Sequence, residues 1–135
     1  MRMMLLAAVS VLLLTAPGSP ADKPAKDDPK RDPLMAEKLK YSQSLLEGLA
    51  VNDFEKIEKS AQELMRISKA AEWAVLKTPT YEVHTNNFRR SAEEIIKKAK
   101  AKNLDGATLA YVDMTVTCIR CHQHCREVRN TSIEP

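Results

Sequence analysis

Residues 54–75 read FEKIEKSAQELMRISKAAEWAV. Apolar and small side chains recur here at alternating intervals of three and four residues, the spacing of one helix face held over three heptads. This stripe consists of Phe54, Ile57, Ala61, Leu64, Ser68, Ala71 and Val75. Asn52 can cap the start of the helix, and Pro79 ends it near Lys77, because a residue before proline is pushed out of the helical region. The period predicts a helix that packs in a bundle.

Three further stretches share this period. Residues 34–50 place on one face Leu39, Ser42, Leu45 or Leu46, and Leu49. Residues 80–102 do the same with Tyr81, His84, Phe88, Ala92, Ile95 and Ala99. After a break at 103–106, where Asp105 can act as a cap, the last stripe consists of Ala107, Tyr111, Met114, Cys118, Cys121 and Cys125. The sequence shows no strand-like alternation, so it predicts an all-α, antiparallel four-helix bundle with short connections.

The composition agrees with a single helical domain. The chain has 135 residues with three glycines and 4% aromatic residues, which disfavours a β-sandwich because that fold needs turn residues and strand aromatics. Twenty-one Lys and Arg face 18 Asp and Glu. This balance gives no indication of nucleic-acid or anionic membrane binding.

The N-terminus has the pattern of an export signal. A basic start at Met1-Arg2 precedes an apolar run over residues 5–14, and small residues near Ala21 offer a cleavage site. We therefore predict a signal peptide at 1–21, with a retained anchor as the alternative, and location in the periplasm. The apolar run is shorter than the roughly 20 residues of a membrane span, so none is expected in the mature form. Residues 22–33, charged and rich in proline, predict a disordered leader before a domain at 34–130.

The segment Cys118-Ile119-Arg120-Cys121-His122 is the attachment signature of a c-type haem. Two thiols one helical turn apart can each add to a haem vinyl group, and the adjoining imidazole can bind the iron. The motif predicts one covalently attached haem on the last helix, with thioethers at Cys118 and Cys121 and His122 as axial ligand. Export supports this, because covalent haem attachment is completed outside the bacterial cytoplasm.

Two other chemistries can use such a motif. A thioredoxin-like redox pair would need a preceding strand, which the pattern does not show. Zinc is the stronger alternative, because five potential ligands lie within eight residues: Cys118, Cys121, His122, His124 and Cys125. Structural zinc sites usually pair two separated ligand couples, however, and only His84 stands apart from this cluster. A helical zinc-binding module therefore remains the alternative without haem.

Residues 39–46, LKYSQSLL, resemble the Lys-Tyr-Arg-Gln-Ser segment of the class II c-type cytochromes, the cytochrome c′ family. That family also carries its attachment motif on the last helix of a four-helix bundle. The resemblance, over residues 34–129, implies that Leu46 covers the distal face of the iron and leaves the sixth position empty. It also places Arg126 beside the proximal pocket. Ser42 stands where the family usually has Arg, so any propionate contact made there must be remade or lost.

The resemblance implies electron transfer, binding of small gases, or both. A pocket lined by Leu46 offers no hydrogen bond to bound O₂, which favours NO and CO. We see no catalytic constellation and predict that the protein is not an enzyme. The family also implies a homodimer through the first two helices, whereas the redox partner is not identified.

The alternative is a low-spin, six-coordinate electron-transfer protein with Met35 as the sixth ligand of the iron. Because Met35 lies about 16 Å along the helix from Leu46, the two side chains cannot both cover one iron.

Four other residues have weaker signals. We expect His84 to be a core or rim histidine and His124, facing away from His122, to lie on the surface. Cys125 is expected to be a buried, unpaired small hydrophobe, with a reactive thiol as the alternative. The sequence does not decide whether Trp73 flanks the haem or covers an edge of the bundle.

Overall fold

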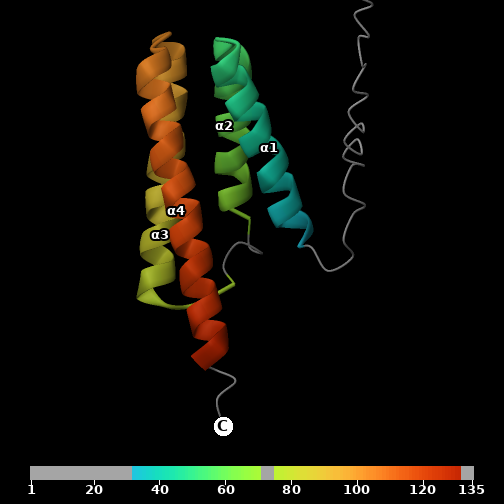
Figure 1. The fold of residues 1–135 in the computed structure, drawn as a ribbon, viewed down its shortest axis with the longest axis vertical. Helices are drawn as coiled ribbons and strands as arrows, with labels where there is room; N and C mark the ends of the chain where they lie inside the picture. The colour runs from blue at the N-terminus through green and yellow to red at the C-terminus, as the bar shows by residue number, and fades with distance from the viewer. Residues whose placement is uncertain (1–31, 71–74, 132–135) are drawn as a thin grey trace, which may run out of the picture.

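The computed structural model describes residues 32–70 and 75–131. Within these ranges the chain forms four helices and no strand: α1 (Pro33–Ala50), α2 (Phe54–Ser68), α3 (Pro79–Lys100) and α4 (Leu104–Thr131). The helices run alternately up and down, beside one another (Figure 1). The prediction of an all-α four-helix bundle is confirmed. No helix in the described ranges is both long and apolar enough to cross a membrane.

The predicted signal peptide at 1–21 and nearly all of the leader at 22–33 lie outside the described residues. The helical region begins slightly earlier than predicted, because Pro33 is the first residue of α1. Proline suits this position, where its fixed φ is helical and the missing N–H would have no partner. The carboxylate of Asp32 accepts a hydrogen bond of 2.8 Å from the backbone N–H of Leu34 and so caps the helix.

Side-chain caps begin the other three helices. Asp53 Oδ1 accepts from the N–H of Lys56 at 3.0 Å, and Thr78 Oγ1 accepts from that of Tyr81 at 3.2 Å. The predicted caps Asn52 and Asp105 are both wrong by one or two positions. Asn52 has a φ of 57°, in the left-handed region that closes the α1–α2 turn, whereas an N-cap residue is usually extended. At α4 the N–H of Gly106 donates instead to Asn103 Oδ1 at 2.8 Å, and Asp105 lies in the first turn, where its charge complements the helix dipole.

The second helix is shorter than predicted. It ends at Ser68 instead of near Lys77, and its terminal carbonyl binds a side chain from another helix. Arg89 of α3 donates through Nη2 to the carbonyl oxygen of Ser68, and through Nε to Ser68 Oγ at 3.2 Å. Val75, placed by the sequence on the apolar stripe, is not helical and is 57% exposed. The predicted positions of Ala71 and Trp73 lie outside the described residues.

All four helices contribute to one hydrophobic core. The stripes of α3 and α4 are confirmed, because the fully or nearly fully buried side chains there include Tyr81, Phe88, Ala92, Ile95, Ala99, Ala107 and Met114. Of the apolar side chains of α1, Leu45 and Leu49 are buried, whereas Leu39 and Leu46 are about half exposed. Leu34, Met35 and Tyr41 pack against the core while partly buried. The reason is that α1 packs mainly against α2, and α4 mainly against α3. This arrangement leaves the side between α1 and α4 less tightly closed.

Candidate haem-binding site

The three residues of the attachment motif share one side of α4. Cys121 and His122 follow Cys118 by three and four residues, which places their side chains about one helical turn further along the same side of the helix. Cys118 and Cys121 are half-buried and pack against the core, whereas His122 is exposed. None of the three cysteines, all of which lie in the described ranges, forms a disulfide bond. The motif therefore lies at the boundary between the core and the surface.

A hollow of about 510 Å³, referred to below as the α1–α4 hollow, lies beside the motif. Its size is within the roughly 300–1,000 Å³ of small-molecule and cofactor sites, and most of its surface is apolar. One wall comes from α1 and the other from α4. The lining residues are Met35, Lys38, Leu39 and Ser42 from α1, and Tyr111, Met114, Thr115, Cys118, Ile119 and His122 from α4. A flat, largely apolar macrocycle attached to α4 fits this chemistry.

Beyond His122, the same side of α4 has a second, smaller hollow of about 310 Å³, and Arg126 lines it together with His122. The imidazole is partly desolvated, which lowers the pKa of His122, and the cations of Lys38 and Arg126 lower it further. A lowered pKa keeps the imidazole neutral, which is the form that binds a metal. Arg126 is exposed and lines this smaller hollow together with His122, and its place beside a proximal pocket stays a prediction from the resemblance.

Cys121 faces the core side of the motif and does not line the α1–α4 hollow. Burial raises the pKa of its thiol to about 11, and the neighbouring Cys125 contributes to this increase while the Lys38 cation opposes it. The Cys121 thiol is therefore protonated near neutral pH. Cys125 is half-buried and packs against the core, less deeply than the sequence suggested.

Three residues of α1 bear on the hollow, and one of them, Leu46, is placed differently from what the resemblance implied. Leu46 is 52% exposed and is not part of the α1–α4 hollow, which ends one turn earlier at Ser42. Met35 does line the hollow, on the wall across from His122. Lys38 also lines it, although the sequence analysis did not select this residue. The sequence did contain an indication of this position. Lys38 lies one turn after Met35 and one turn before Ser42, so all three share one face of the helix.

The two remaining histidines lie together, away from the hollow. Nε2 of His124 lies 2.7 Å from Oγ1 of Thr78, and the rings of His124 and His84 have centroids 6.2 Å apart. His124 is therefore half-buried against the start of α3, and not on the surface as predicted. Throughout residues 32–70 and 75–131, no three His, Cys, Asp or Glu side chains come together as a metal site. This geometry gives the zinc alternative no support.

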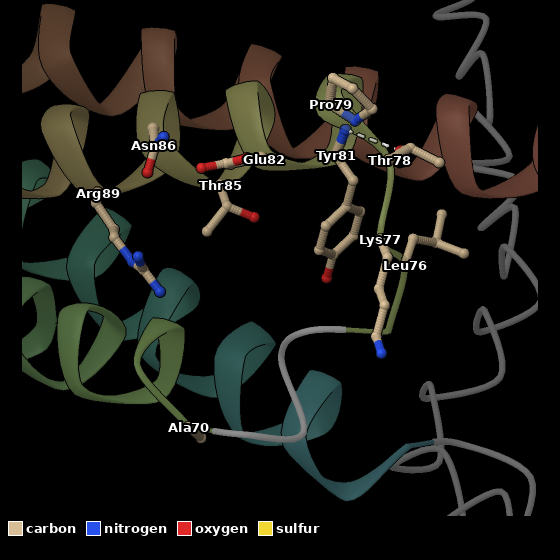
Figure 2. A pocket seen from close by; sticks show the side chains of 10 residues that line it. All are labelled: Ala70, Leu76, Lys77, Thr78, Pro79, Tyr81, Glu82, Thr85, Asn86 and Arg89. Carbon is tan, nitrogen blue, oxygen red and sulfur yellow. Dashed lines mark hydrogen bonds between the residues drawn. The ribbon is translucent and has the colours of Figure 1, made fainter.

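A further pocket, of about 450 Å³, lies between the end of α2 and the start of α3 (Figure 2). Tyr81 and Thr85 project into it from α3, and Ala70 borders it on the other side. No residue of the attachment motif lines it, so we do not connect it with the candidate site.

Comparison of the chain with protein-family models, with curated proteins and with solved structures found no match.

Proposed function

We propose that this chain is an exported c-type haem protein that holds one haem through thioethers at Cys118 and Cys121, with His122 as the axial ligand. The observation that supports this most directly is that Cys118 and His122 line the same apolar hollow between α1 and α4. Two of the three functional residues of the Cys-x-x-Cys-His motif therefore line a space of suitable size and polarity, and Cys121 lies on the core side of it. In addition, a neutral imidazole at His122 suits metal ligation.

In this proposal the haem supplies a reversible one-electron couple and a coordination position. The chain's own residues attach it, exclude water and control access. Met114 and Ile119 provide apolar surface on the α4 wall, and Leu39 does so on the α1 wall. The function is electron transfer, binding of small ligands such as NO and CO, or both, without enzymatic turnover. The family resemblance adds a periplasmic location and a homodimer to the proposal.

Met35 supports a second candidate function. Its thioether lines the α1 wall of the hollow, whereas His122 lies on the α4 wall. A thioether bound opposite the axial histidine gives a six-coordinate iron, as in electron-transfer cytochromes c. In that case the protein would be a low-spin electron carrier with no open position. Leu46, which the resemblance places over the iron, would have to move inward from its exposed position to do so.

The experiment is expression in a host competent for c-type maturation, followed by optical spectra of the oxidised, reduced, and reduced and CO-treated protein. Colour that survives denaturation and acid–acetone extraction demonstrates covalent haem. We expect C118A/C121A to lose this colour, and C125A, which alters a third thiol on the same helix, to keep it. A colourless wild-type protein from this host would contradict the proposal.

The same spectra distinguish the two candidates. A broad reduced Soret band that sharpens and shifts with CO indicates an open sixth position. Sharp, split visible bands that do not change when CO is added indicate that a protein side chain occupies the sixth coordination position. If that ligand is Met35, M35L should convert the second spectrum into the first, whereas the neighbouring apolar change L34A should not.

A further inference from the structure

The outer face of α4 has a second apolar stripe, separate from the one that faces the core. It consists of Leu109, Val112, Val116 and Ile119, which are 72%, 53%, 39% and 54% exposed. Their spacing of three, four and three residues is that of a helix face that packs against another helix. Met114, which is buried, lies two positions from both valines and therefore points to the opposite side of α4. The core of the chain leaves this outer stripe uncovered.

The outer stripe of α4 is the largest group of exposed apolar side chains on one helix in the described part of the chain. The other exposed large apolar residues in these ranges are Leu39, Leu46, Val51, Val75 and Val83. Two of them belong to α1, one to α3 and none to α2. Single exposed apolar residues are normal on a protein surface, whereas a contiguous row of them indicates an interaction surface.

The outer stripe is complementary to itself when two copies of α4 meet in opposite directions. A two-fold axis that passes between Val112 and Val116 places these two residues of one copy opposite each other's counterparts in the second copy. The same axis places Leu109 of each copy opposite Ile119 of the other, because both pairs have the same midpoint in the sequence. Every apolar side chain of the stripe then contacts an apolar side chain of the second copy.

The charges along one edge of the outer stripe fit this arrangement. Asp113 and Arg120 are exposed and lie two helical turns apart on the edge next to α3. The carboxylate of Asp113 accepts a hydrogen bond from Ser91 Oγ of α3, which holds it on that edge. In an antiparallel pair this edge meets the same edge of the second copy. The two carboxylates then lie near the two-fold axis, flanked on both sides by a guanidinium, and the four charges sum to zero.

We propose that the outer stripe of α4 is the surface through which two copies of this chain associate in antiparallel orientation. This inference does not depend on a haem, and it differs from the resemblance, which places a dimer on the first two helices. Leu109 of the second copy packs against Ile119, which lines the α1–α4 hollow and the smaller hollow beside it. Association therefore covers the outer edge of the candidate haem site. Only one helix of each copy takes part, so the interface is smaller than the roughly 1,600 Å² of a standard one, and we expect a dissociation constant of about 10–500 μM.

The test is analytical ultracentrifugation of the purified protein over a range of concentrations that spans this dissociation constant. The wild-type mass should change from that of a monomer to that of a dimer. V112K places a charge in the outer stripe and should raise the dissociation constant about tenfold or more. V83K makes the same change at a valine of α3 that is 55% exposed, and L46K introduces the charge on α1; both should stay within about twofold of the wild type. Circular dichroism verifies that each variant is folded.

Photo-cross-linking tests the direction of the pair. Benzoylphenylalanine in place of Leu109 should attach to the region around Ile119 of the second copy, whereas a parallel pair would give attachment around Leu109 itself. Mass spectrometry locates the link, and a mixture of isotopically light and heavy protein separates links between copies from links within one copy.

Four outcomes would overturn the inference. A wild-type protein that stays monomeric well above 500 μM has no such interface. Equal dimerisation of V112K and the wild type would show that the outer stripe is not in the contact. Loss of the dimer in L46K, with V112K unaffected, would place the contact on α1, and equal loss in V83K would indicate a general effect of added charge. The spectra of the haem are a separate measurement, so the proposed function stands or fails independently of these results.

Discussion

The guanidinium of Arg89 on α3 donates to the backbone carbonyl oxygen of Ser68, the last residue of α2. The last carbonyls of a helix have no partner within the helix, and a buried one needs a donor from elsewhere. Because Ser68 is fully buried, water cannot readily donate a hydrogen bond to its carbonyl oxygen. Arg89 therefore both ends α2 and holds it against α3.

Replacing Arg89 by Met should destabilise the protein. The substitution removes two hydrogen bonds and leaves the Ser68 carbonyl without its side-chain donor, which should lower the free energy of unfolding by about 1–3 kcal/mol. Urea unfolding followed by circular dichroism at 222 nm measures this. R90M, which alters the exposed neighbouring arginine, is the control and should change the value by less than about 0.5 kcal/mol. Equal stabilities of R89M and R90M would show that the contact does not cap α2.

This contact also explains what the sequence could and could not predict about the fold. The three-and-four period identified all four helices, because it reflects burial of one face and needs no knowledge of the partner. The end of α2 depends on Arg89, a residue on another helix, and no local pattern contains that information. Val75 continued the period but lies beyond the cap, so it was wrongly assigned to the core.

The packing of the core predicts that truncating Leu64 lowers the free energy of unfolding strongly and that truncating Leu109 lowers it only slightly. Leu64 on α2 is fully buried, whereas Leu109 on α4 is 72% exposed. Leu64→Ala removes buried methyl groups and leaves a cavity, so we expect a loss of about 2–5 kcal/mol in the free energy of unfolding. Leu109→Ala makes the same chemical change in solvent and should cost less than about 0.5 kcal/mol. Comparable losses in the two variants, measured by urea unfolding, would contradict this packing.

Gly48 should not tolerate a methyl group, although it lies inside a helix. Ala is normally favoured over Gly there by about 1 kcal/mol. A Cβ on Gly48, however, would lie 3.0 Å from Cγ1 and 3.1 Å from the backbone N of Ile57, where α2 crosses close to α1. We therefore expect Gly48→Ala to lower the melting temperature instead of raising it, because backbone atoms cannot move aside cheaply. A raised melting temperature would show that the two helices separate readily.

The candidate site was predictable only in part, for a related reason. The motif itself specified Cys118, Cys121 and His122, because attachment chemistry requires a fixed local spacing. The opposite wall depends on how α1 packs, which local sequence does not encode. Lys38 was overlooked because a charged residue in a helical pattern is normally assigned to the solvent side, and only the tertiary packing shows that it is buried.

The raised pKa of Cys121 predicts a loss of stability at alkaline pH in the reduced apoprotein. Burial raises this pKa from 9.0 to about 11, so the folded state holds the thiol proton more tightly than the unfolded state does. The resulting stabilisation is complete below pH 9 and is lost as the pH rises through 11. Tyr81, whose pKa burial also raises, acts in the same direction. We therefore expect the free energy of unfolding to fall between pH 9 and 11.

Urea unfolding at a series of pH values, with a thiol reductant present, measures this decline. Cys121→Val removes the titrating thiol and should flatten the decline between pH 9 and 11, leaving the part that belongs to Tyr81. Cys118→Val, the matched change one turn earlier on α4, should leave most of the decline in place. If both valine variants lost stability with pH as steeply as the wild type, the Cys121 thiol would be as accessible to water in the folded chain as in the unfolded one.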